Sequence, residues 1–169
     1  MAKMSVGKTE AIKWKSKDGR EIEGRLTYAK NYAAGTKVPM IVNIHGGPAG
    51  VFSQGYIGGR GVYPIATFAD RGYAILRPNP RGSSGYGADF TYSTRGRWFA
   101  EDYQDLMKAV DIAAARADVD STRMGVTGGS YGGVMTAWVT VKTDRFKAAQ
   151  ADRMISNWWS WYGTSDVQG

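Results

Sequence analysis

A serine flanked by glycines is the feature of this sequence best suited to chemistry. Ser130 is the central residue of Gly-Gly-Ser-Tyr-Gly at positions 128–132, between a predicted strand and a predicted helix. This spacing is typical of a nucleophile elbow, a strained turn that exposes the serine hydroxyl. Gly128 and Gly132 leave room where side chains would collide with neighbouring residues. A helix N-terminus also favours negative charge beside the serine. The pattern predicts Ser130 as the nucleophile of an acyl-transfer reaction.

Acyl transfer also needs hydrogen-bond donors for the oxyanion that forms on the substrate. The backbone N–H of Tyr131, directly after the serine, is one candidate. The segment His-Gly-Gly-Pro at positions 45–48 follows another apolar strand and supplies a second donor, because glycines let the backbone approach a substrate oxygen. The same glycines would also suit a tight turn with no role in binding, and the sequence leaves both interpretations open.

The general base is harder to find in this sequence. His45 is the single histidine, and it ends a strand that we expect to lie beside the Ser130 strand. We therefore predict it as the candidate base, provided that its ring approaches the serine. The alternative is a turn residue hydrogen-bonded to the backbone. The carboxylates of Asp102, Asp105 and Asp152 have no geometric support from the sequence as substitutes.

The elements that must position these residues are predicted from hydrophobic patterning. Residues 10–14 and 21–28 alternate around an Asp-Gly turn, which predicts a β-hairpin. Strands and helices then alternate, which predicts an α/β fold with a mostly parallel sheet and helices on both faces. Ligands in such sheets bind at the carboxyl ends of the strands, where the glycine-rich segments fall. The expected later strands are residues 38–44, 73–77, 123–127 and 146–151, and the expected helices are residues 63–71, 98–117 and 131–141.

Composition narrows the class of protein. A length of 169 residues indicates one domain over residues 1–169 with room for a core. The net charge of +7 comes from scattered basic residues, so nucleic-acid binding is not expected. The chain has no cysteine, no apolar run of membrane-spanning length and no apolar stretch typical of a signal peptide. We expect a soluble, cytoplasmic protein with no metal and no cofactor.

Several segments together resemble one known family. His-Gly-Gly-Pro at 45–48, Asn-Pro-Arg-Gly-Ser-Ser-Gly-Tyr-Gly at 79–87, Asp-Tyr-Gln-Asp at 102–105 and the Ser130 segment are similar to the prolyl oligopeptidase family, in its acylaminoacyl-peptidase and dipeptidyl-peptidase-like branch. The resemblance extends from about Glu10 to Asp166. It implies an α/β-hydrolase fold, a serine peptidase or esterase ancestry, and an oxyanion hole formed by the Gly47 and Tyr131 amides. It also implies that Arg81 anchors its loop.

One departure from the family leaves three interpretations of the activity. Family members carry the triad Asp and His well downstream of the serine, whereas 39 residues follow Ser130 in this chain (169 minus 130). We therefore expect a truncated domain that lacks its last strands and cleaves small activated esters slowly, with little peptidase activity. The alternative is a non-catalytic fragment that acts as an oligomerising or binding scaffold. A new activity in an open pocket is a third interpretation, but no residue pattern points to it.

The expected partners are a small ester or peptide-like substrate and a second copy of the chain. Residues 146–151 would form an open sheet edge, which invites pairing with another strand. The aromatic tail, residues 158–162, would be exposed or buried in a partner. We therefore predict a homo-oligomer that uses this edge and tail, with adsorption to membranes through the tryptophans as a weaker alternative.

Overall fold

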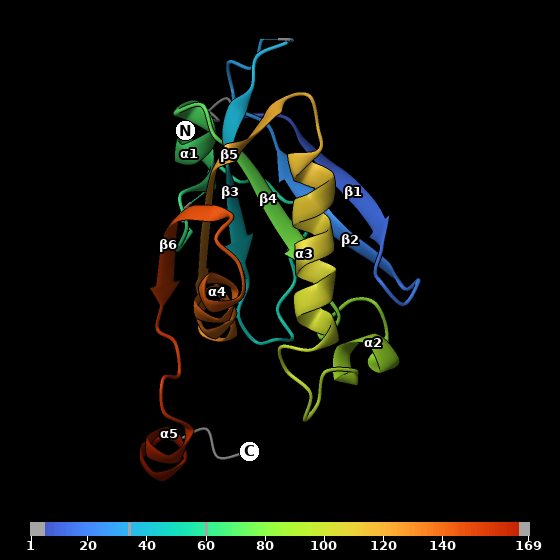
Figure 1. The fold of residues 1–169 in the computed structure, drawn as a ribbon, viewed down its shortest axis with the longest axis vertical. Helices are drawn as coiled ribbons and strands as arrows, with labels where there is room; N and C mark the ends of the chain where they lie inside the picture. Colours follow the sequence, from blue (N-terminus) through green and yellow to red (C-terminus); the bar gives the residue numbers. More distant parts are fainter. Residues whose placement is uncertain (1–5, 34, 60, 166–169) are drawn as a thin grey trace.

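One mixed sheet organises the computed structural model, which describes residues 6–33, 35–59 and 61–165. Its strand order is β1-β2-β4-β3-β5-β6. The hairpin β1–β2 and the pair β2–β4 are antiparallel, whereas β4, β3, β5 and β6 run parallel to one another (Figure 1). In chain order the elements are β1 (Thr9–Lys15), β2 (Glu21–Thr27), β3 (Val38–Ile44), α1 (Ile65–Asp70), β4 (Ala74–Asn79), α2 (Ala88–Tyr92), α3 (Glu101–Ala114), β5 (Val119–Gly129), α4 (Tyr131–Lys142), β6 (Phe146–Asp152) and α5 (Trp158–Thr164).

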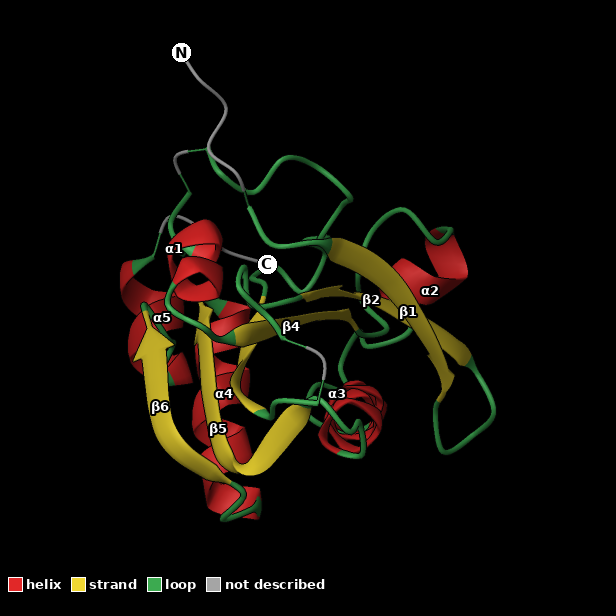
Figure 2. Cartoon of the chain, turned by 90° about the horizontal axis from the view of Figure 1, so that it is seen from above, coloured by secondary structure: helices red, strands yellow, loops and turns green. Residues whose placement is uncertain are grey.

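Helices cover both faces of this sheet, as the alternating pattern predicts. Helices α3 and α4 pack on one face, and α1 packs on the other (Figure 2). The first face holds the larger core, because Val42, Leu76 and Val126 point towards it from neighbouring strands. Alternate residues of the same strands point to the α1 face, where Ile75 contacts Ile65 and Ala69. The sheet therefore carries two buried faces of different size.

The predicted strands and helices are confirmed, but several of their bounds are wrong. The helix predicted for residues 98–117 begins at Glu101, because Phe99 has a left-handed φ of 68° and donates its N–H to the Asp102 carboxylate at 3.1 Å. Strand β5 is longer than residues 123–127 and continues to Gly129, directly before Ser130. The short helices α2 and α5 have no counterpart in the predicted set.

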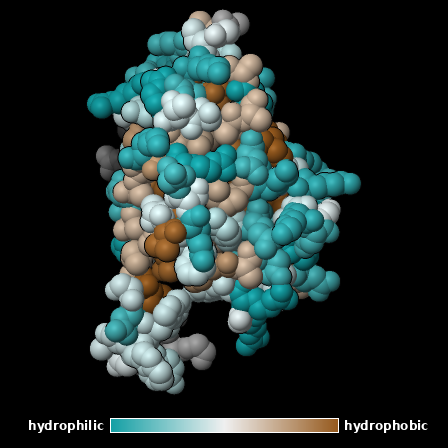
Figure 3. All heavy atoms as spheres, viewed as in Figure 1, coloured by the Kyte–Doolittle hydropathy of each residue, from teal (hydrophilic) through white to brown (hydrophobic). Residues whose placement is uncertain are grey.

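Strand β6 and helix α5 are the most exposed elements of the described chain. β6 pairs with β5 on one side and ends the sheet on the other, and residues 147–151 are all exposed. Helix α5 stands apart from the sheet at the foot of Figure 1, and Trp159 is 90% exposed. In the space-filling view this helix forms a pale projection below the body (Figure 3). None of the described helices has the length and apolar character needed to cross a lipid bilayer.

Candidate active site

Ser130 occupies a sharp turn between β5 and α4, at the carboxyl end of the sheet. Its backbone angles are φ 58° and ψ −123°, and the residue is exposed. A Cβ at Gly128 would lie 2.5 Å from the Gly132 carbonyl oxygen, and a Cβ at Gly132 would lie 2.2 Å from the Ile44 carbonyl oxygen. Any side chain at either position would therefore collide with backbone. The two glycines allow β3, β5 and α4 to meet closely enough to present the serine at the surface.

The glycine loop after β3 lies directly against this turn. A Cβ at Gly46 would be 3.3 Å from the Ser130 Cβ and 3.9 Å from its Oγ. Gly47 has a φ of 121°, which a residue with a side chain rarely adopts. The N–H of Tyr131, in the first turn of α4, has no acceptor within its own helix. The predicted oxyanion-hole residues therefore both lie near Ser130, since Tyr131 follows it directly and Gly47 follows Gly46.

A pocket of about 690 Å³ opens over the serine, and Ser130, Gly47 and Tyr131 all line it. Part of its wall is aromatic, because Trp98 and the α5 residues Trp158 and Trp161 line it. The rings of Trp98 and Trp158 meet edge to face, with centroids 5.5 Å apart. Helix α5, which the sequence predicted only as an aromatic tail, therefore forms one side of the pocket.

The structure turns the side chain of His45 away from Ser130. Its Nε2 is 2.9 Å from Ser83 Oγ, and its Nδ1 is 2.9 Å from the Gly46 carbonyl oxygen. Burial lowers the pKa of the imidazole below 6.5, so the ring is neutral at pH 7. The main chain of His45 does touch the elbow, since a Cβ at Gly132 would lie 2.7 Å from its carbonyl oxygen. These contacts fit the turn-residue alternative, and the described structure does not join the imidazole to Ser130.

A buried hydrogen bond ties the elbow to α3. Tyr131, one residue after Ser130, donates its hydroxyl to Asp102 Oδ2 at 2.5 Å. The Asp102 carboxylate also accepts the backbone N–H groups of Phe99 and Tyr103. Burial raises the pKa of Asp102, although these three donors oppose the shift. Burial, followed by the charge of Asp102, raises the pKa of the Tyr131 hydroxyl well above 10.0, so this hydroxyl keeps its proton. Asp102 therefore joins α3 to the turn at Ser130 through the Tyr131 hydroxyl.

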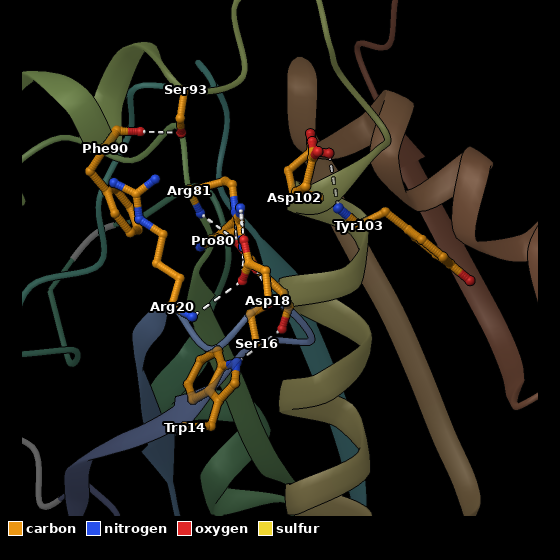
Figure 4. Close-up of polar contacts among 12 residues, drawn as sticks. Trp14, Ser16, Asp18, Arg20, Pro80, Arg81, Phe90, Ser93, Asp102 and Tyr103 are labelled. Carbon is orange, nitrogen blue, oxygen red and sulfur yellow. Dashed lines mark hydrogen bonds and ion pairs between the residues drawn. The ribbon is translucent and has the colours of Figure 1, made fainter.

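Arg81 anchors the loop after β4. Its Nε and Nη2 each donate to the Asp105 carboxylate at 2.8 Å, and its Nη1 donates to Asp18 at 2.7 Å. In Figure 4 the side chains of Arg81 and Asp18 point toward one another. Trp14 donates its indole N–H to the Asp105 carbonyl oxygen, which joins the hairpin to the same cluster. This paired fork of hydrogen bonds matches the anchoring role that the family resemblance implied for Arg81.

Two residues near the serine were not identified by the sequence analysis. Ser130 donates its backbone N–H to the Asp152 carbonyl oxygen at 3.0 Å, and Tyr63 donates its hydroxyl to the Asp152 carboxylate at 3.0 Å. A Cβ at Gly129 would lie 2.9 Å from that Tyr63 hydroxyl and 3.1 Å from Arg153 Nη2. Tyr63 and Arg153 therefore flank the elbow. None of the sequence motifs described above includes either residue.

Together, the mixed sheet with β4 and β3 at its centre and a serine elbow after β5 define part of an α/β-hydrolase fold. A model of the prolyl oligopeptidase family matches residues 63–168. The chain belongs to the prolyl oligopeptidase family, whose members are serine peptidases. The predicted resemblance is therefore confirmed.

Individual relatives agree with this assignment. The uncharacterized peptidase YuxL of Bacillus subtilis is 43% identical over 94% of this chain and 23% of its own length. A probable dipeptidyl-peptidase 5 of Emericella nidulans is 33% identical over 75% of this chain and 17% of its own. The acylaminoacyl peptidase of Pyrococcus horikoshii superposes with a TM-score of 0.86 at 35% identity, over 98% of this chain and 26% of that one. The chain thus spans about a quarter or less of the length of these relatives.

Proposed function

We propose that Ser130 is a working nucleophile that cleaves small activated esters slowly. The observation that carries this proposal is the exposed serine at φ 58°, in one pocket with the Gly47 and Tyr131 amides. Its Oγ would lose its proton to solvent water and attack the substrate carbonyl carbon, while the two N–H groups bind the developing oxyanion. Collapse of the tetrahedral intermediate would expel the alcohol and leave an acyl group on Ser130. Water would then hydrolyse that acyl group and regenerate the serine.

The choice of an activated ester follows from the surroundings of Ser130 Oγ. Among the described residues, no side chain accepts a hydrogen bond from this oxygen, and the His45 ring contacts Ser83 instead. Serine proteases that lose triad members keep roughly 10³–10⁴-fold acceleration over water through the oxyanion hole and binding. An activated alcohol leaves without a proton, whereas an amine needs a general acid. Peptide cleavage would therefore require an acid and a base that the described residues do not place at Ser130.

The test is hydrolysis of p-nitrophenyl acetate by the wild-type chain and two variants. Ser130→Ala removes the nucleophile, and Ser156→Ala removes another hydroxyl from the wall of the same pocket. We expect Ser130→Ala to lose about tenfold or more of the rate and Ser156→Ala to match the wild type. Mass spectrometry after a fluorophosphonate probe should show a single adduct on Ser130. Equal rates for wild type and Ser130→Ala would contradict the proposal.

We propose a second role, self-association, because the sheet ends in an exposed strand. Residues 147–151 of β6 present unpaired backbone groups, and Trp159 on α5 is nearly fully exposed. A second copy of the chain would pair with this edge and cover the aromatic helix. If Ser130 proves unreactive, a scaffold built on this contact becomes the leading function.

Light scattering at micromolar concentration tests this second role. We expect a dimer for the wild type and a monomer for Ala149→Lys, because a charged side chain on an edge strand disfavours pairing. The exposed Thr140 on α4 provides a matched control, and Thr140→Lys should remain dimeric. A monomeric wild type would contradict self-association through this edge.

A further inference from the structure

Four buried polar atoms form one row across the α1 face of the sheet. They lie on the adjacent strands β5, β3, β4 and β2, and none has a hydrogen-bond partner in the described part of the chain. Asn43 is paired with Thr127, and Arg25 is paired with Arg77. The register of β3 with β4 continues the row between these two pairs. The four atoms are Thr127 Oγ1, Asn43 Nδ2, Arg77 Nε and Arg25 Nε.

Arg77 is the charged residue of this row that forms no ion pair in the described chain, whereas Arg25 is paired with Glu23. It is 6% exposed, and its polar contact is a long one, 3.5 Å from Nη2 to Thr27 Oγ1. Its guanidinium lies 5.4 Å from the centre of the Phe52 ring. In the described chain no carboxylate forms an ion pair with Arg77, whereas Arg81 is paired with Asp18 and Asp105. Burying a cation without a counter-charge costs free energy, so an anion bound beside Arg77 would stabilise the fold.

The charged residues around Arg77 increase its need for a counter-charge. Arg25 stands directly opposite on β2, and like charges opposite one another in a sheet destabilise it. Glu23 forms an ion pair with Arg25 at 2.6 Å, so this acidic group is already engaged. Burial, and then the charge of Arg25, lowers the pKa of Arg77. Burial and the neighbouring charge of Arg25 therefore both favour an anion beside the Arg77 guanidinium.

A pocket of about 260 Å³ gives access to this guanidinium. Arg77 lines it from the sheet, and Phe52, Ser53, Ile57 and Tyr63 line it from the loop that precedes α1. Its size suits a group of few atoms and not a peptide. This pocket is separate from the one over Ser130. Tyr63 lines it and also donates its hydroxyl to Asp152, the residue whose carbonyl oxygen accepts the Ser130 N–H.

We propose that this pocket binds a small oxyanion, a carboxylate or a phosphate group, with the Arg77 guanidinium as its principal ligand. The planar fork of arginine offers two parallel N–H donors, which match the paired oxygens of either group. The apolar ring of Phe52 beside the guanidinium limits hydration and strengthens the attraction. The site would be occupied independently of chemistry at Ser130.

Thermal unfolding of the full chain tests the proposal, with sodium phosphate or sodium acetate titrated against sodium chloride at constant ionic strength. We expect a saturable rise in Tm with at least one of the two anions, and the one that saturates at lower concentration identifies the group. Arg77→Gln should weaken the apparent affinity by about tenfold or more, since a charge-assisted pair is lost. Two control variants, Arg95→Gln at an exposed arginine and Ser130→Ala, should show the same rise in Tm with the anion as the wild type.

Two results would overturn the proposal. The first is a wild-type Tm that responds to phosphate, acetate and chloride alike. The second is an Arg77→Gln variant that binds the anion as tightly as the wild type. If Arg77→Gln does not fold, Arg77→Lys keeps the positive charge but loses the fork, and it should also bind more weakly. The Ser130→Ala arm separates failure of this site from failure of the proposed hydrolase activity.

Discussion

The contribution of the Tyr131–Asp102 hydrogen bond to the free energy of unfolding can be measured directly by removing the hydroxyl. Tyr131→Phe removes the hydroxyl and keeps the ring, which stacks on Phe99 with an angle of 6° between the ring planes. Tyr131 is 2% exposed and Asp102 is 0% exposed, so water cannot readily replace the lost donor. Hydrogen bonds to charged groups contribute about 1.5–3 kcal/mol. We expect the free energy of unfolding to fall by that amount.

This change lies well within reach of equilibrium measurements. For a chain of this size 1 kcal/mol corresponds to a Tm shift of roughly 2–4 °C, so Tyr131→Phe should lower Tm by about 3–12 °C. Urea unfolding followed by tryptophan fluorescence gives the same quantity from the transition midpoint, provided that the m-value is unchanged. A change in m would indicate that the variant also alters the compactness of one of the two states.

Tyr103→Phe provides the matched control for this experiment. Tyr103 contacts the same carboxylate through its backbone N–H, while its ring points away from Asp102 (Figure 4). Removal of its hydroxyl should cost less than about 0.5 kcal/mol, as for a typical substitution away from buried contacts. If the two variants lose equal stability, the Tyr131–Asp102 bond contributes nothing specific, and a supporting role of Asp102 beneath the elbow is refuted.

Two further predictions concern the backbone of the elbow and the charge of His45. Gly132→Ala should lower the free energy of unfolding in urea by about 1–3 kcal/mol or more, because the new Cβ would lie 2.2 Å from the Ile44 carbonyl oxygen. The same variant should abolish fluorophosphonate labelling of Ser130. Gly125→Ala on β5 is the control and should be close to neutral, because the nearest atom to its Cβ is 3.6 Å away. The pKa of His45 is lower in the folded chain than its unfolded value of 6.5, so its contribution to stability is complete above pH 6.5 and is lost as the pH falls through the folded pKa. Wild type should therefore lose stability relative to His45→Gln as the pH falls from 7.5 towards 5, by up to about 1.4 kcal/mol per pH unit, and parallel curves would contradict burial of a neutral imidazole.

Local patterns in the sequence were sufficient for the main elements and for the sharp turn that presents Ser130. The bounds of β3, Val38–Ile44, match the predicted strand residue for residue, because a continuous apolar run between polar loops admits few other structures. The elbow was predictable for a similar reason: the glycines at 128 and 132 lie within one turn of the serine, so their spacing alone encodes the geometry. The start of α3 was not predictable, because Phe99 continues the helical pattern and only its left-handed backbone removes it from the helix.

The tertiary structure decided every feature that depends on partners distant in the chain. The orientation of His45 follows from Ser83, 38 residues away, and the position of Tyr131 follows from Asp102, 29 residues before it. Arg77 and Arg81 are both arginines near the end of β4, but only the packed fold gives one of them two carboxylates and leaves the other without any in the described chain. Residue types and spacing determine which groups are available and which turns they form. Burial and distant contacts determine which of those groups are paired, neutral or free to bind, because the free energy of a polar side chain depends on neighbours that the fold brings to it.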